Sequence, residues 1–109
     1  MTSHEMLNTY ETLTELTGVM LDAARQGEWD HLAELEQRCR RHVTSLMQAA
    51  PATLNESEQR ARNASIRAIL QNDAEIRALA EPRLNELQQR LHAIRAGRHG
   101  TQAYAAQRI

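Results

Sequence analysis

Residues 66–94 read IRAILQNDAEIRALAEPRLNELQQRLHAI, and this stretch decides the fold. Its large apolar side chains recur every three or four residues, the spacing that places side chains on one face of an α-helix. The stretch is far longer than a β-strand, so it predicts one long amphipathic helix. Such a helix must bury its apolar surface against other helices or against a partner. The apolar residues are Ile66, Ile69, Leu70, Ile76, Leu79, Leu84, Leu87, Leu91 and Ile94.

The composition of the whole chain predicts an all-α fold in a single domain, residues 1–109. The 109 residues include no Phe, one Trp and two Pro, whereas the helix formers Ala, Leu, Arg, Glu and Gln are abundant. We therefore expect an antiparallel bundle of three main helices, in which the third is long, followed by a short C-terminal helix.

The first two helices are expected at residues 5–26 and 31–49. Gly27 can take the left-handed conformation that ends a helix. Asp30 is a natural N-cap for the second helix, and Trp29 before it is placed to pack back on the helix pair. Because the connection is short, these two helices should be antiparallel neighbours.

The third helix is expected to cover residues 56–96. Asn55 followed by Glu58 resembles a capping box, which marks its beginning. Pro82 lacks a backbone N–H, so we expect a bend there. Gly97 and Gly100 are expected to end the helix, and a last short helix should cover residues 101–108.

The chain carries no signal for export or for membrane insertion. The N-terminus lacks a basic region followed by an apolar one, and no run approaches the roughly 18 apolar residues that a membrane span needs. Cys39 is the only cysteine, which suits a reducing compartment. These features predict a cytoplasmic protein.

The charge pattern gives little support to a nucleic-acid-binding function. The net charge is −1, and residues 1–36 carry eight of the fourteen acidic residues but one of the thirteen basic ones. Packing of an acidic first helix on later basic helices would neutralise this asymmetry. Since acids are interleaved with the arginines, we expect no direct binding to nucleic acid.

No pattern in the sequence predicts catalysis, a cofactor or a metal. The Glu28-x-x-His31 spacing occurs in di-iron bundles, but such sites need the motif twice. Cys39 lies on an apolar stripe, as a small core residue does. No glycine-rich phosphate loop is present. We expect a non-enzyme.

The third helix offers more apolar surface than one packing seam can use. One continuous face, at positions i, i+4, i+7 and i+11, is predicted to bind a partner helix, with Ile69 beside it. The alternative is that Ile66 and Leu70 are core residues and that Asp73 and Arg77 form an ordinary exposed pair. The residues of this face are Ile66, Leu70, Asp73 and Arg77.

Tyr104, together with Ala103, is a second candidate. A short helix is marginal alone, so it should dock or fray. If it docks, the ring of Tyr104 would enter the apolar groove and compete with the partner. The alternative is a loosely packed terminal aromatic residue.

Several short motifs in this order resemble the flagellar export chaperone FliT family over essentially the whole chain. They are Gly27-Glu28-Trp29-Asp30, Leu70-x-Asn72-Asp73, Arg83-Leu84-x-Glu86-Leu87, and Ala103-Tyr104 after the basic Arg95–Arg98 segment. The resemblance implies a small helical bundle that binds the filament-cap protein FliD in the cytoplasm. It also implies contact with the export ATPase complex (FliI and FliJ) and, in some bacteria, inhibition of the flagellar master transcription regulator.

Two features depart from the family pattern: Pro82 interrupts the central helix, and the tail stops soon after Tyr104. Both departures concern control by the tail and contact with the transcription regulator more than binding of the cap protein. Two further readings stay open. One is a protein that mainly sequesters a transcription factor, and the other is a structural coiled-coil homodimer that uses the surplus apolar face.

Overall fold

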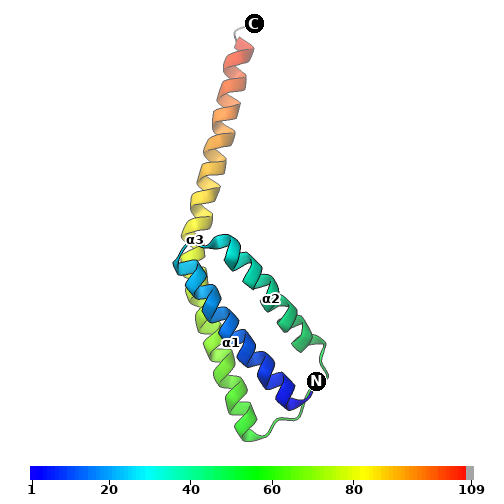
Figure 1. Ribbon diagram of the computed structural model, residues 1–109. Helices are drawn as coiled ribbons and strands as arrows, with labels where there is room; N and C mark the ends of the chain where they lie inside the picture. Colours follow the sequence, from blue (N-terminus) through cyan, green and yellow to red (C-terminus); the bar gives the residue numbers. More distant parts are fainter. Residues whose placement is uncertain (108–109) are drawn as a thin grey trace. The chain divides into compact units, whose positions relative to one another are not determined.

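The computed structural model describes the backbone of residues 1–107 and the side chains of residues 1–97. The described chain contains α1 (Ser3–Arg25), α2 (Trp29–Gln48) and α3 (Glu56–Gln107), and no strand within residues 1–107 (Figure 1). The all-α prediction is therefore confirmed. The chain divides into two units, Met1–Ala78 and Leu79–Ile109, so the first unit holds α1, α2 and the beginning of α3.

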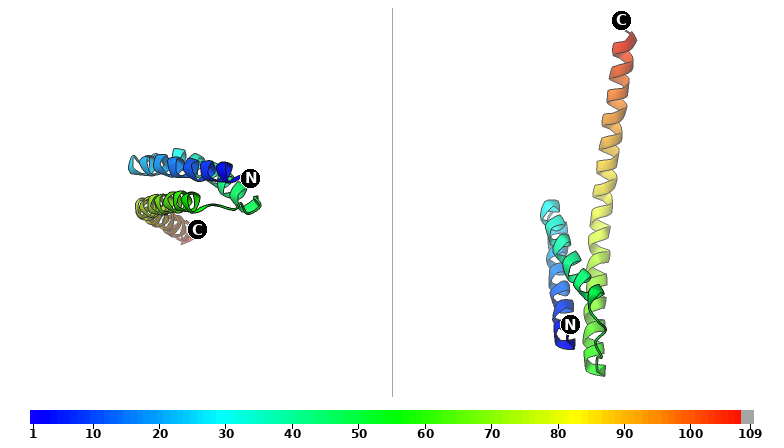
Figure 2. Two further views of the ribbon diagram at one scale, coloured as in Figure 1. Left: turned by 90° about the horizontal axis from the view of Figure 1, so that it is seen from below. Right: turned by 90° about the vertical axis from the view of Figure 1, so that its right-hand side faces the viewer.

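Within the first unit, α2 returns antiparallel to α1, and α3 then runs in the direction of α1. Two further views show α1 and the first part of α3 side by side (Figure 2). The connections are short enough to impose this up-down-up order. None of the described helices is both long and apolar enough to cross a membrane.

Gly27 ends α1 as the sequence predicted. Its φ is 72°, in the left-handed region that an L-residue with a side chain adopts at a cost. The Gly27 N–H donates to the Ala24 carbonyl at 3.2 Å, and the Glu28 N–H donates to the Ala23 carbonyl at 2.9 Å. This is the Schellman pattern, which satisfies carbonyls that the helix end leaves open.

The start of α2 differs from the prediction. The helix begins at Trp29, and the N-cap position is Glu28, whose side chain makes no capping hydrogen bond. The Leu32 N–H already bonds the Glu28 carbonyl at 3.0 Å, so Asp30 lies inside the first turn. There its carboxylate faces the positive end of the helix dipole instead of capping it. Trp29 is half-buried and packs against the core, as predicted.

Asn55 and Glu58 form the predicted capping box at the start of α3. The Asn55 side-chain oxygen accepts from the Glu58 N–H at 2.8 Å, and the Glu58 carboxylate accepts from the Asn55 N–H at 3.0 Å. Two backbone donors that the helix end would leave open are thereby satisfied.

Replacing Asn55 with Ala is expected to lower the free energy of unfolding by about 1 kcal/mol, because the Glu58 N–H loses its acceptor. Urea unfolding followed by circular dichroism measures the change. Thr53→Ala, at a neighbouring exposed position outside the box, is the control and should change stability by less than about 0.5 kcal/mol. An equal loss in both variants would show that the box contributes nothing.

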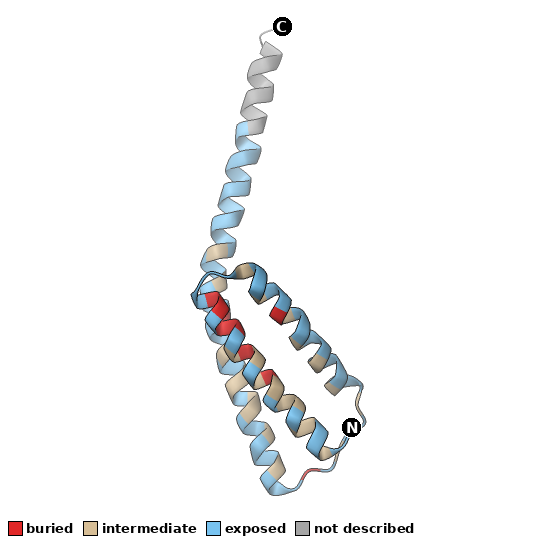
Figure 3. Cartoon of the chain, in the orientation of Figure 1, coloured by how far each residue is buried: buried red, intermediate tan, exposed pale blue. Residues whose placement is uncertain are grey.

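The core of the first unit is small and centres on the C-terminal half of α1 (Figure 3). On α1, Leu13, Thr17, Met20 and Ala24 are buried at intervals of four, three and four residues, the spacing of one helix face. On α2, Met47 is 81% exposed, whereas its neighbour Leu46 is half-buried. Consecutive helical residues point about 100° apart, so both cannot face inward. The buried cluster is Met20, Leu21, Ala23, Ala24, Leu35 and Ile76.

The far end of α3 also differs from the prediction. The helix continues through positions 97 and 100 to Gln107, so the expected end at 96 and the separate helix over 101–108 are not found. A glycine inside a helix costs only about 1 kcal/mol relative to Ala. The helix formers around positions 95–103 can offset that cost. Pro82 lies inside α3, and the bend expected there stays a prediction.

Candidate partner-binding groove

An apolar groove of about 400 Å³ opens on the first unit, between α2 and α3. We refer to it below as the groove. Residues of α1 form its floor, and residues of α2 and α3 form its two walls. The floor is Leu13, Thr17 and Met20; the α2 wall is Glu36, Cys39, Arg40, Val43 and Thr44; and the α3 wall is Ile69, Leu70 and Asp73.

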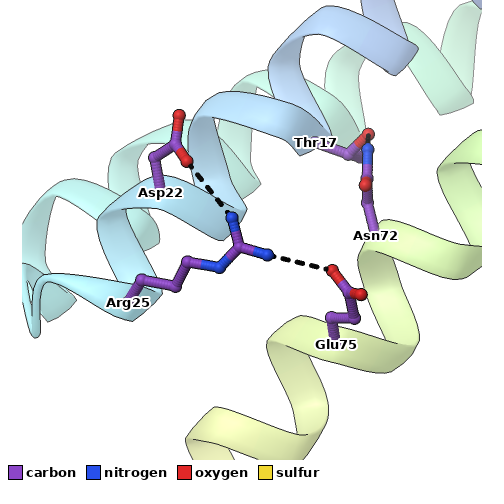
Figure 4. Close-up of polar contacts among 5 residues, drawn as sticks. All are labelled: Thr17, Asp22, Arg25, Asn72 and Glu75. Atoms are coloured by element: carbon purple, nitrogen blue, oxygen red, sulfur yellow. Dashed lines mark hydrogen bonds and ion pairs between the residues drawn. The ribbon is translucent and has the colours of Figure 1, made fainter.

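Two polar contacts hold the α3 wall against the α1 floor (Figure 4). The Asn72 amide donates to the Thr17 hydroxyl at 3.1 Å, and that hydroxyl donates to the Leu13 carbonyl at 2.8 Å. A hydroxyl both donates and accepts, so the buried Thr17 is satisfied. About one turn further along α3, Glu75 lies 3.5 Å from Arg25 at the end of α1. This exposed ion pair adds little stability but agrees with the same register of the two helices.

Charged pairs flank the apolar centre on both walls. Asp73 and Arg77 of α3 form an ion pair at 3.0 Å, and Glu36 and Arg40 form the corresponding pair on α2. Both pairs are largely solvent-exposed, so they contribute little to folding. Their position gives the groove an apolar middle with charged edges, the pattern that recognises an amphipathic segment.

The structure brings three of the five predicted partner-binding residues into the groove. Leu70 is 61% exposed, whereas Ile69 and Asp73 are half-buried. Arg77 joins them through its ion pair with Asp73. Ile66 is half-buried and does not line the groove. That these residues bind a partner stays a prediction.

The sequence analysis missed the floor and the α2 wall. Cys39, expected as a small core residue, is half-buried and packs against the core, whereas Val43 of the same wall is 42% exposed. A signal was present: α2 carries apolar residues through its last turns, more than contact with α1 alone can cover. A surplus of apolar side chains indicated a binding surface on α3, and the same surplus indicates one on α2.

Cys39 behaves as a small apolar residue of the groove wall. Burial raises the pKa of its thiol, and the neighbouring Glu36 carboxylate raises it further. The thiol therefore stays protonated at neutral pH, and its sulfur lies 3.4 Å from the Met20 sulfur. Among the described side chains, no group of three His, Cys, Asp or Glu residues could hold a metal ion.

The second set of candidates, Tyr104 and Ala103, lies outside the described side chains. Their backbone belongs to the last turns of α3. Docking of Tyr104 in the groove stays a prediction.

Comparisons with known proteins identify relatives over most of the chain. The model of the family described as "Flagellar protein FliT" matches residues 7–106. The crystal structure of flagellar protein FliT from Bordetella bronchiseptica is 31% identical, with a TM-score of 0.69, over 77% of this chain and 96% of that chain. A search of curated proteins gives no match. The sequence and structure comparisons agree on the family.

Proposed function

The chain belongs to the FliT family of flagellar proteins, and from this we propose that it is a chaperone of flagellar export. The client proposed is the filament-cap protein FliD, bound in the cytoplasm so that it does not assemble early. The chaperone would then hand FliD to the export ATPase complex (FliI and FliJ). In this proposal the protein acts by binding and carries out no reaction.

The observation that carries the proposal is the groove itself. A chaperone for a helical client needs an apolar surface that is open in the free protein, and Leu70 and Val43 are exposed on opposite walls. An amphipathic client helix would place its apolar side chains between them, over the floor residue Met20. Full burial of one large apolar side chain contributes about 1.5–3 kcal/mol, so a few such contacts support binding in the micromolar range.

The exposed pairs at the edges would orient the client. Arg40 and Arg77 lie on different walls, and each already has an acidic partner on its own helix. A client with polar or charged residues beside its apolar face could form hydrogen bonds or ion pairs with these side chains in place of the pairs within each helix. No charge would then be left unpaired. Specificity for one client segment would come from this matching more than from the apolar contacts.

The direct test is calorimetric titration of the protein with the C-terminal segment of the filament-cap protein from the same organism. We expect binding of micromolar affinity or tighter, with a negative heat-capacity change from buried apolar surface. A scrambled segment of the same composition is the control. Absence of binding to the native segment, or equal binding to the scrambled one, would contradict the proposal.

Regulation by the tail is proposed together with this function. For Tyr104, with Ala103 beside it, to compete with the client for the groove, the end of α3 would have to leave the helix and turn back. If the tail covers the groove nine-tenths of the time, a chain that ends at Gly97 should bind the client about tenfold more tightly. The same titration measures this, and Tyr104→Ala in the full chain should reproduce part of the gain. Unchanged affinity in both would exclude the tail as a cover.

Inhibition of the flagellar master transcription regulator is a further proposal taken from the family resemblance. A regulator that used the groove would compete with FliD. Adding the FliD segment to a complex of this protein and the regulator should then release the regulator. Persistence of the complex at saturating FliD segment would show that the regulator does not use the groove.

A further inference from the structure

A second pocket of the first unit, of about 490 Å³, lies between α1 and α2. We refer to it below as the basic pocket, because its α2 wall carries arginine and histidine side chains and none of the described acidic residues lines it. Its floor comes from α1. The floor is Thr12 and Leu16, and the α2 wall is Arg38, Arg41, His42 and Ser45.

The basic pocket and the groove use opposite flanks of α2. The wall of the basic pocket follows the i, i+3, i+4, i+7 spacing of one helix face. The groove instead takes Glu36, Cys39 and Val43 from the same helix, together with Arg40 and Thr44. At about 100° per residue, the two sets of side chains point roughly 180° apart. A ligand in one site therefore does not block the other.

The guanidinium groups of Arg38 and Arg41 form no ion pair with the described acidic residues. Glu34, four residues before Arg38, lies 3.9 Å from His31 instead. The residue four positions before Arg41 is the uncharged Gln37. Both arginines are exposed. The basic pocket thus presents two positive charges to which a ligand can bind without displacing a partner within the chain.

The remaining polar groups of the basic pocket determine which ligand fits. The Thr12 hydroxyl donates to the Asn8 carbonyl at 2.9 Å, and the Ser45 hydroxyl donates to the Arg41 carbonyl at 3.1 Å. The backbone N–H groups in the middle of a helix are also used, so the arginines and the His42 ring supply the donors. Compact phosphate groups are typically bound by free backbone N–H groups. The geometry therefore favours carboxylates, with which arginine forms paired hydrogen bonds.

We propose that the basic pocket binds an acidic helical segment of a second protein and leaves the groove free for its own ligand. Arg38 and Arg41 lie about one turn apart, so acidic side chains one turn apart on the partner helix would reach both. An apolar side chain between those acids would cover the half-buried Leu16. The proposal does not rest on the chaperone function, since no residue of the groove takes part.

Nuclear magnetic resonance of the full chain, titrated with a designed peptide, tests the proposal. The probe is a helical peptide with glutamates one turn apart on both sides of a leucine, and the control peptide has glutamine in place of each glutamate. We expect the acidic probe to shift the side-chain Nε–H signals of Arg38 and Arg41 and the amide signals of Thr12 and Leu16. The amide signals of residues 69–73, on the α3 wall of the groove, should not change.

Charge reversal identifies the side chains that bind. Arg38→Glu combined with Arg41→Glu should weaken binding of the acidic probe about tenfold or more. Arg60→Glu combined with Arg67→Glu is the matched control, because it changes the net charge equally at exposed positions of α3 outside the basic pocket. That control should leave the affinity within about twofold. Circular dichroism should show that both double variants keep their helices.

Four results would each overturn the proposal. The acidic probe could produce no shifts, or the glutamine peptide could produce the same shifts. An equal loss of affinity in the two double variants would show a general attraction between charges. Shifts confined to residues 69–73 would place the probe in the groove. Tighter binding of tripolyphosphate than of the acidic probe, lost on reversal of Arg38 and Arg41, would assign the basic pocket to phosphate groups.

Discussion

Replacing Leu70 with Asp is expected to weaken binding of the FliD segment by about 100-fold or more. Leu70 is the most exposed large apolar side chain of the groove. The substitution removes its apolar contact with the client, which contributes up to about 3 kcal/mol. It also places a carboxylate where the client would strip it of water, and no basic residue of the client is expected there. Together these effects amount to the loss of measurable binding in calorimetry.

The folded protein should tolerate the Leu70 substitution, because the side chain is 61% exposed. Gln71→Asp is the matched control, since it puts the same charge on the next residue of α3, which does not line the groove. Both variants should unfold within about 0.5 kcal/mol of the original protein. Retained binding in Leu70→Asp, with the original protein also binding, would move the client site away from the groove.

Local signals in the sequence predicted the connections well, because the hydrogen bonds that make them join residues close in the chain. The Gly27 turn and the Asn55–Glu58 capping box each involve residues no more than five positions apart. Their partners could therefore be read from the order of residue types. Asp30 shows the limit of this reasoning, since Glu28, two positions before it, occupies the N-cap position instead.

The groove could not be predicted in full, because it depends on distances between helices. Helical spacing places Leu70 and Ile76 on the apolar side of α3, yet Leu70 is 61% exposed and Ile76 is 8% exposed. Only the packing of α3 on α1, with Asn72 bonded to Thr17, decides which of them the core covers. A pattern of residue types indicates the faces of a helix and leaves open which face is covered.

The length of α3 was underestimated for a similar reason. Gly97 and Gly100 are typical of helix ends, but a glycine ends a helix only when the chain turns there. Gly27 turns and has φ of 72°, whereas Gly97 lies inside α3. A turn after Gly97 would need a stabilising contact, such as an apolar side chain that packs back on the helix. The sequence around Gly97 shows no residue of this kind. Helix propensity alone then allows α3 to continue.

Leu35 of α2 is the residue on which the first unit should depend most for stability. It is 3% exposed and is the one buried residue of α2, in a core shared with α1 and Ile76 of α3. Replacing it with Ala should lower the free energy of unfolding by about 3 kcal/mol, since the lost apolar contacts add to the cost of the cavity left behind. That is a large part of the roughly 5–15 kcal/mol typical of a folded domain.

Urea unfolding monitored by circular dichroism measures this loss as a lower midpoint at unchanged slope. Met47→Ala on the same helix is the control, because that side chain is 81% exposed and its removal should cost less than about 0.5 kcal/mol. The contrast between the two also bears on the groove. Leu35 anchors α2 against α1, and α2 carries the groove wall with Cys39 and Val43. A loss below about 1 kcal/mol in Leu35→Ala would mean that α2 is weakly packed in solution and that the wall is not preformed.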